Sequence, residues 1–243
     1  MTLRNAMHTL APALRRGLGD ALLPQRCIVC GRYGAAVHEE CLDALPDAAP
    51  PRCPRCWLPT AGDLRGARRR DGACPRCAAA PPPFEGLRTP YRFVGHARRA
   101  VIEAKFRGVS ALLDPLGRAA ARAAPSSWSF DVVTAVPLHG ARRRRRGFDQ
   151  AELLASAVAD ELGAPLHRGV LRRRRSTGAQ TALGVDRRRR NMAGAFEVRT
   201  APPPSVLLVD DVATTGATLG AAARALLDGG AERVYALAVA RED

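Results

Sequence analysis

The stretch VLLVDDVATTGATL, from Val206 to Leu219, carries the clearest structural pattern in the sequence. Four apolar residues, Val206 to Val209, predict a short buried strand, and Asp210 and Asp211 follow at its carboxyl end. Small and hydroxyl residues from Ala213 to Thr218 then lead into a predicted helix. In a parallel α/β sheet, ligands bind beyond the carboxyl ends of the strands. The sequence therefore predicts a ligand site at this point.

The residue types in this stretch suit a sugar phosphate. A helix N-terminus presents free backbone N–H groups and readily binds phosphate. Two carboxylates beside such a terminus suit ribose hydroxyls or a phosphate-bound Mg²⁺. A buried strand followed by a solvated acidic turn is the structural alternative, because short motifs also arise by chance.

Two other phosphate-handling folds fit the sequence poorly. A response-regulator receiver places its acidic residues early in the domain, whereas only a short stretch of chain follows Asp211. A P-loop requires the pattern G-x-x-x-x-G-K-[ST], in which the lysine reaches the phosphates. Lys105 is the single lysine of the chain and stands in EAKFRG. The P-loop is therefore excluded.

The chain of 243 residues is strongly basic, with a formal net charge of +15 at pH 7. Such an excess favours nucleic acid, anionic lipid or polyphosphate ligands. Nearly all of the positive charge is arginine, and Ala, Gly and Pro are abundant. This composition indicates a GC-rich genome, so the arginine content reflects codon usage as well as function. The apolar fraction of 47% is sufficient for a hydrophobic core.

The sequence predicts a cytoplasmic protein without a membrane span. No apolar run approaches the ~18 residues that cross a bilayer. The N-terminal segment lacks the continuous apolar region of a signal peptide, and residues 3–18 are interpreted as an amphipathic helix. Seven cysteines, mostly in C-x-x-C pairs, are typical of metal binding in a reducing compartment.

Eight cysteine and histidine residues form two candidate zinc sites. His38 stands three residues before Cys41, which repeats the spacing of the C-x-x-C pairs. The later set has C-x₂-C-x₁₇-C-x₂-C spacing, which is typical of zinc. Closed sites of this kind are structural. Alternatively, His38 is a surface histidine and Cys41 a small buried residue. The two sets are Cys27, Cys30, His38 and Cys41, and Cys53, Cys56, Cys74 and Cys77.

This cysteine module either binds DNA or a partner, or replaces a core that its residues cannot build. Trp57 could stack on a base, although packing is the commoner role for a lone tryptophan there. The segment AAAPPPF, residues 78–84, predicts a stiff linker. The expected domains are therefore residues 1–83, with the N-terminal helix and both zinc sites, and residues 84–243. Arginines that make nucleic-acid contact plausible are Arg52, Arg55, Arg65, Arg68, Arg69, Arg70 and Arg76.

Strands and helices alternate after the linker, which predicts an α/β fold with a parallel, doubly wound sheet. Asp149 and Glu152 have capping-box spacing before the helix AELLASAVADELG. Helices are also expected at about 96–106 and 111–124. Strands are expected at 91–95, 130–139, 165–166, 195–198, 206–209 and 234–239.

Three runs of arginine lie near the predicted ligand edge. Arg142 to Arg146 follow the strand that ends near Val136. Arg172 to Arg175 and Arg187 to Arg190 flank STGAQTALGVD, a segment whose position would let it close over a charged ligand. Such runs are usually solvated, but three of them at one edge favour contact with an anion or with nucleic acid.

The stretch from Val206 to Leu219 resembles the phosphoribosyl diphosphate (PRPP) signature of type I phosphoribosyltransferases. In that family two adjacent acidic residues hold the ribose hydroxyls, and the following loop wraps the 5′-phosphate. The residues that this resemblance assigns to PRPP are Asp210, Asp211, Ala213, Thr214, Thr215, Gly216, Ala217 and Thr218.

Nearly the full chain resembles the ComF family, which pairs a cysteine module with a phosphoribosyltransferase-like domain and is associated with competence. The segments that carry the resemblance are ALLPQRCIVCG, the later cysteine pairs, IEAKFRG, VPLHGARRRRRGFDQAELLA, STGAQTALGVDRRRRNMAGAF and VLLVDDVATTGATL. The resemblance implies a type I phosphoribosyltransferase-like sheet behind a zinc-binding module. It also implies single-stranded DNA and a DNA-uptake helicase as partners.

Further roles follow from the resemblance alone. Val136, Pro137 and Leu138 are expected to approach the pyrophosphate, and Thr177 and Gln180 to lie in a flexible loop. If the protein is an enzyme, Asp210 and Asp211 orient the ribose, Mg²⁺ stabilises the departing pyrophosphate, and Arg142 or Arg146 assists. The residues expected to contact nucleic acid are Arg142, Arg143, Arg144, Arg145, Arg146, Arg187 and Arg188.

The sequence departs from the family pattern at two positions. Asp149 stands where the family commonly has asparagine, and a carboxylate cannot donate the hydrogen bond that asparagine would offer a ligand. His38 replaces a cysteine, which zinc tolerates. Three functions remain open: a DNA-handling factor, an active phosphoribosyltransferase with an unknown acceptor, and a PRPP-sensing regulator.

Overall fold

The computed structural model of the protein describes residues 25–60, 72–140, 148–174, 192 and 194–243. The chain divides into two compact units, one that ends at Ala44 and one from Leu45 to Asp243. The sequence placed the domain boundary later, between residues 83 and 84. The second cysteine set consequently belongs to the same unit as the sheet. The helix expected at residues 3–18 lies outside the described residues.

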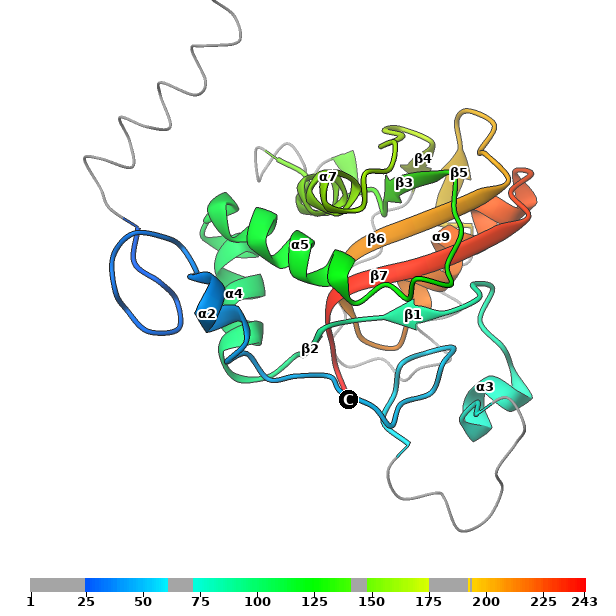
Figure 1. Cartoon of the computed structure of the whole chain (residues 1–243). Coiled ribbons are helices and arrows are strands. Elements are labelled where there is room, and N and C mark those ends of the chain that lie inside the picture. Colours follow the sequence, from blue (N-terminus) through cyan, green and yellow to red (C-terminus); the bar gives the residue numbers. More distant parts are fainter. Residues whose placement is uncertain (1–24, 61–71, 141–147, 175–191, 193) are drawn as a thin grey trace, which may run out of the picture. The chain divides into compact units, whose positions relative to one another are not determined.

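The larger unit is built on a five-stranded sheet whose strands all pair in parallel (Figure 1). Its path is β1–β7–β6–β3, and β2 pairs with β7 beyond β1. The expected α/β fold class with a parallel sheet is thereby confirmed. The strands are β1 (Leu87–Arg88), β2 (Tyr91–Arg92), β3 (Val132–Ala135), β6 (Ser205–Ala213) and β7 (Arg233–Arg241).

Helices cover both faces of the sheet (Figure 1). One face carries α9 (Ala217–Asp228). The other carries α4 (Gly95–Phe106), the short helix η1 (Ser110–Leu112), α5 (Leu113–Arg122) and α7 (Gln150–Leu162). A sheet covered on both faces requires apolar side chains on both, which explains the continuous runs in β6 and β7. Two further short helices are α2 (Glu39–Leu42), in the smaller unit, and α3 (Pro75–Ala79).

A separate antiparallel pair joins β4 (Leu171–Arg173) to β5 (Phe196–Val198). The sequence predicted the second of these strands but interpreted the first as part of an arginine run. Leu171 is buried, whereas Arg172 is exposed, so the alternation of a half-buried strand is present within three residues. A strand this short, with two arginines, gives too weak a pattern to be recognised.

Within the part of the chain that the structure describes, no helix combines the length and the apolar character needed to cross a bilayer.

The packing of α5 on α7 leads to a prediction for Gly117→Ala. A Cβ atom at Gly117 would lie 2.7 Å from Cβ of Ala157 and 3.0 Å from the carbonyl oxygen of Leu154. Because helix backbones cannot shift cheaply, we expect a loss of about 1–3 kcal/mol in the free energy of unfolding. Urea denaturation followed by circular dichroism measures this loss.

Gly220→Ala in α9 is the matched control, since its Cβ would meet no atom closer than 3.6 Å, the Cδ of Pro83. Here the gain in helix propensity should leave stability unchanged or raise it by up to about 1 kcal/mol. Equal stability of Gly117→Ala and wild type would contradict the close approach of the two helices.

Candidate functional site

The acidic pair lies inside β6, which is longer than the four-residue strand that the sequence predicts. Asp210 pairs with Ala238 of β7, and the ladder continues to Ala213. Successive side chains of a strand point to opposite faces. Asp211 therefore lies on the face covered by α4, α5 and α7, and Asp210 on the face covered by α9.

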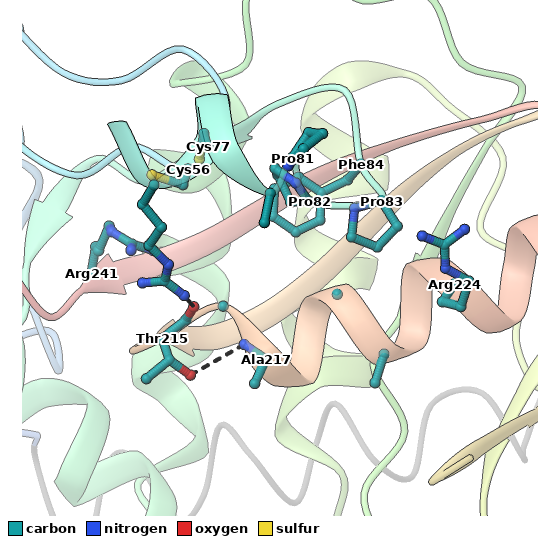
Figure 2. A pocket seen from close by; sticks show the side chains of 15 residues that line it. Cys56, Cys77, Pro81, Pro82, Pro83, Phe84, Thr215, Ala217, Arg224 and Arg241 are labelled. Carbon is teal, nitrogen blue, oxygen red and sulfur yellow. Dashed lines mark hydrogen bonds between the residues drawn. The ribbon is translucent and has the colours of Figure 1, made fainter. Parts of the chain in front are cut away.

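A tight turn connects β6 to α9. Gly216 precedes the helix with a φ of 75°, in the left-handed region that favours glycine. The backbone N–H of Ala217 donates to Oγ1 of Thr215 at 3.3 Å (Figure 2). The residues from Ala213 to Thr218, predicted to surround a phosphate, are thus brought together at the carboxyl end of β6, beside the N-terminus of α9.

Lys105 forms an ion pair with Asp211, and the sequence analysis missed it. Its Nζ lies 2.8 Å from Oδ1 of Asp211, and both side chains are largely buried, with 25% and 16% of their surface exposed. Lys105 stands in the last turn of α4. One signal was available: a chain with 38 lysine and arginine residues has lysine at this position alone.

Asp210 takes up a proton near neutral pH. Burial, followed by the neighbouring Asp211 carboxylate, raises the pKa of Asp210 to about 7. Lys105, the backbone N–H of Asp211 and Arg173 act in the opposite direction. That N–H donates to Oδ1 of Asp210 at 2.8 Å. The site therefore holds one carboxylate balanced by Lys105 and a second that is easily neutralised.

The predicted pyrophosphate turn lies beside this acidic pair. Val136 extends the pairing of β3 with β6, since its N–H donates to the carbonyl of Val209 at 2.8 Å. The next residues are held by Asp149, which accepts from the N–H of Leu138 at 2.9 Å and from that of Ala151, in α7, at 3.1 Å. Asp149 is buried and positions this turn through two acceptor oxygens. Asparagine has only one such oxygen.

The arginine runs divide between described and undescribed residues. Arg172 and Arg174 pair with Glu197 at 3.6 and 3.1 Å. Arg173 instead lies with its guanidinium carbon 5.5 Å from the centre of the Phe196 ring. The predicted residues that lie outside the described part of the chain are Arg142, Arg143, Arg144, Arg145, Arg146, Thr177, Gln180, Arg187 and Arg188.

Both predicted cysteine sets come together. In each set the four candidate ligand atoms lie within 4.8 Å of one another, close enough for a metal ion. In the first set, Nδ1 of His38 lies 3.4 Å from Sγ of Cys30, while Nε2 lies 3.2 Å from the carbonyl oxygen of Tyr33. A metal-binding histidine commonly donates its second ring nitrogen to such a carbonyl. His38 thus presents Nδ1 to the centre of the set.

The second set has the dimensions of a tetrahedral site. Sγ of Cys56 and Sγ of Cys74 are 3.7 Å apart. Two thiolates bound tetrahedrally at about 2.3 Å from one ion would be about 3.8 Å apart. The backbone N–H of Cys74 also donates to Sγ of Cys53 at 3.3 Å, as in a site whose thiolates are held by the backbone. Each set can therefore hold one metal ion.

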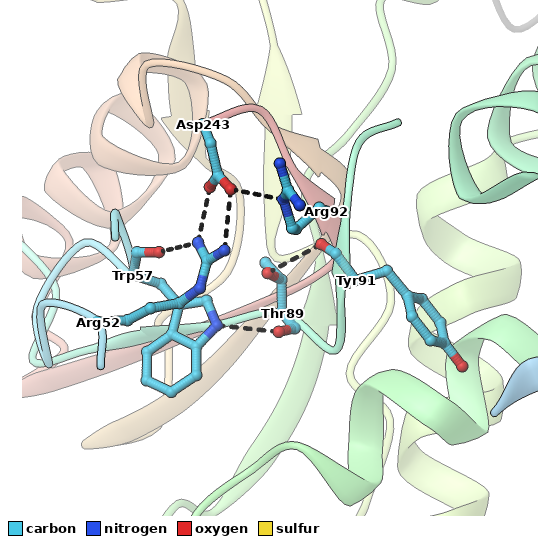
Figure 3. Close-up of polar contacts among 6 residues, drawn as sticks. All are labelled: Arg52, Trp57, Thr89, Tyr91, Arg92 and Asp243. Carbon is cyan, nitrogen blue, oxygen red and sulfur yellow. Dashed lines mark hydrogen bonds and ion pairs between the residues drawn. The ribbon is translucent and has the colours of Figure 1, made fainter. Parts of the chain in front are cut away.

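The two sets begin with the same turn. Antiparallel bridges join Arg26 to Tyr33 and Arg52 to Pro59, and each first cysteine is followed four residues later by a residue in the left-handed region. That residue is Gly31 in the first turn and Trp57 in the second. The indole N–H of Trp57 donates to the carbonyl of Thr89 at 2.9 Å (Figure 3). Trp57 therefore has a packing role.

Arg52 and Arg76 have structural contacts of their own. The side chain of Arg52, 4% exposed, binds both carboxylate oxygens of Asp243 at 2.6 and 2.9 Å, and Arg92 reaches the same carboxylate (Figure 3). Arg76 donates to the carbonyl of Thr215 at 2.8 Å. Arg52 is thus buried against Asp243, and Arg76 connects the second cysteine set to the turn before α9.

Comparison with known proteins assigns the chain to a family, although no protein-family model matches it. It is 31% identical over 196 residues to the DNA utilization protein YhgH of Salmonella typhimurium, which covers 78% of this chain and 83% of the relative. The chain belongs to the ComF family. Competence protein F of Haemophilus influenzae is 34% identical to this ComF protein over 115 residues, 46% of the chain and 50% of the relative.

Solved structures similar to this ComF protein include the glutamine PRPP amidotransferase from B. subtilis. It is 24% identical, with a TM-score of 0.35, over 51% of this chain and 25% of that one. Orotate phosphoribosyltransferase from Aeropyrum pernix is 19% identical, with a TM-score of 0.27, over 60% and 69%.

The titration of Asp210 leads to a prediction for Asp210→Asn. Since the folded-state pKa is raised to about 7 from an unfolded value of about 4, the wild-type fold loses stability as the pH rises between these values. Asparagine avoids the buried charge. We therefore expect the variant to be about 1–2 kcal/mol more stable than wild type at pH 8, and close to wild type at pH 4.

Urea unfolding at both pH values measures the effect. Asp228→Asn, at the exposed end of α9, is the control and should show no such difference between the two pH values. A stability difference for Asp210→Asn that stays constant from pH 4 to pH 8 would contradict the raised pKa.

Proposed function

We propose that this ComF protein takes part in DNA utilization or competence, as a factor that binds PRPP or a nucleotide phosphate together with single-stranded DNA. The observation that carries the proposal is the acidic pair of β6, adjacent to the turn into α9 and to the turn after β3. Carboxylates at a helix N-terminus suit a ribose phosphate. The names of the relatives, DNA utilization protein and competence protein, support the role in DNA handling.

Binding would divide between three groups of residues. The backbone N–H groups between Ala213 and Thr218 face the 5′-phosphate, and Asp210 and Asp211 orient the ribose hydroxyls. Val136, Pro137 and Leu138, held in place by Asp149, lie beside the pyrophosphate. Mg²⁺, when bound with PRPP, supplies positive charge that stabilises the pyrophosphate. A ligand hydroxyl at Asp211 must share that carboxylate with Lys105 or displace the lysine.

An active phosphoribosyltransferase is the second candidate, because the acidic pair and the phosphate turn are both present. The ribose would be attacked at its anomeric carbon while pyrophosphate departs, with Arg142 or Arg146 assisting. Fold alone does not establish turnover. A regulator that senses PRPP would use the same residues without that step.

Labelled PRPP with Mg²⁺ tests this proposal. Wild type should bind PRPP, and Asp210→Asn/Asp211→Asn should bind at least tenfold more weakly, since it loses two charged hydrogen-bond acceptors. Asp228→Asn, remote from the turn, should bind as wild type does. Pyrophosphate release with any nucleobase acceptor would assign a transferase, and binding without release would assign a binding factor or regulator. Absence of PRPP binding by wild type would reject the site.

Single-stranded DNA gives the second arm of the same experiment. Affinity should fall steeply with salt, and Arg143→Gln/Arg144→Gln/Arg145→Gln should lower the log–log salt slope by about 2. The control Arg98→Gln/Arg199→Gln/Arg233→Gln removes the same charge from other exposed positions. Equal slopes for the two triple variants would argue against a specific role of residues 143–145.

We also propose that both cysteine sets bind structural zinc. Three thiolates with one imidazole, or four thiolates, form closed tetrahedral sites that suit Zn²⁺ and leave no position for catalysis. None of the seven cysteines, all of them described by the structure, forms a disulfide, so all are available as metal ligands. The zinc would stabilise short turns that have little core of their own.

Metal analysis of the full-length protein tests the zinc sites. Wild type should contain two zinc ions per chain, and His38→Ala should contain one. His38→Cys should keep two, because the thiolate replaces the imidazole as a ligand. A single ion in wild type, unchanged in His38→Ala, would remove the first set from the proposal.

A further inference from the structure

A pocket of about 270 Å³ lies between the first turns of α9, the end of β7 and the segment that follows the second cysteine set (Figure 2). Pro81, Pro82 and Pro83 form one wall, and Gly216, Ala217 and Gly220 contribute to another. Asp210, Asp211, Lys105 and the turn after β3 are not among its lining residues. The pocket is therefore adjacent to the proposed PRPP site but is not formed by its carboxylates.

Three arginines line this pocket: Arg76, Arg224 and Arg241. Within the described part of the chain, no aspartate or glutamate lines it. Cys56 and Cys77 of the second cysteine set also line it, and their metal-bound thiolates would balance part of this positive charge. Guanidinium groups also match the geometry of phosphate oxygens. The lining thus has the charge and the hydrogen-bond donors of an anion site.

Arg241 is the decisive residue. Its side chain is almost fully buried, with 1% of the residue exposed. Among the residues that the structure describes, neither Nε nor Nη1 of Arg241 has a hydrogen-bond acceptor. A buried charged donor without a partner is costly. Metal-bound thiolates of the second cysteine set would offset part of the charge, but neither of these two atoms donates a hydrogen bond to a sulfur.

The N-terminus of α9 adds the positive end of the helix dipole, beside the N–H groups that the proposed PRPP site uses. This twelve-residue helix begins at Ala217, and its first residues line the pocket. The hydrogen bond from Arg76 to the carbonyl of Thr215 fixes the turn beside them. A helix N-terminus favours anions. A buried arginine with unpaired donors and a helix N-terminus consequently line one cavity.

We propose that this pocket binds a phosphate group, carried by a mononucleotide or by single-stranded DNA, with Arg241 and Arg224 as its charged contacts. Arg241 supplies donors that the fold leaves unpaired, and Arg224, exposed on α9, adds a second guanidinium group to the lining. The volume accommodates a phosphate with part of its sugar. This site would place a second phosphate beside the turn that the proposed PRPP site also uses.

Two variants of the full-length, zinc-loaded protein test the pocket by different means. Arg224→Gln removes a charge at an exposed position, and Gly220→Leu fills the cavity without changing the charge. Titration with inorganic phosphate by calorimetry should show about tenfold weaker binding for both variants. Arg233→Gln, at the opposite end of β7, is the control and should bind as wild type does. Equal phosphate affinity in all four proteins would overturn the proposal.

PRPP and nucleic acid serve as further probes. Both variants should bind PRPP within twofold of wild type, so a parallel loss of phosphate and PRPP binding would assign the pocket to the PRPP site and overturn the proposal. If wild type does not bind PRPP, the phosphate titration still stands alone. Weaker binding of dAMP alone in the variants would identify a mononucleotide as the source, and weaker binding of oligo(dT) would identify DNA.

Discussion

The ion pair between Lys105 and Asp211 is the contact on which the candidate site depends. A strand buried on both faces would not tolerate two adjacent carboxylates near its end without compensation. Lys105 balances Asp211, and Asp210 is left to be neutralised by a proton near pH 7. The same contact fixes the last turn of α4 against β6. The acidic pair thus remains at the edge of the sheet at a limited cost to the fold.

Parallel pairing brings the other half of the site to the same edge. Because Ala135 is paired with Val209, the residues that follow β3 emerge beside Asp210 and Asp211 of β6. Asp149 then joins the turn after β3 to the start of α7 through two backbone hydrogen bonds. An aspartate at this position cannot donate a hydrogen bond to a ligand, as asparagine could. Its two acceptor oxygens instead bind two backbone N–H groups and hold the turn in place. Positioning of the turn accordingly depends on an acidic side chain.

Much of this arrangement was predictable from local pattern. Three predictions came from residues that lie close together in sequence: the strand at Val206–Val209, the turn of small residues after it and the two cysteine sets. These predictions agree with the structure. The partner of Asp211 was not predictable, because Lys105 lies far away in sequence and its role depends on tertiary packing. The expected boundary between residues 83 and 84 stays a prediction; by contacts, the second cysteine set belongs to the same compact unit as the sheet.

The arginine content illustrates a limit of reasoning from net charge. A charge of +15 predicts an anionic partner, yet Arg52 is buried against Asp243 and Arg172 and Arg174 pair with Glu197. Their planar fork makes such contacts favourable inside a fold. The arginines most informative about ligands are therefore those with buried donors that no acceptor meets. Arg241 is such a residue, and its burial next to a helix N-terminus is more informative than the total charge.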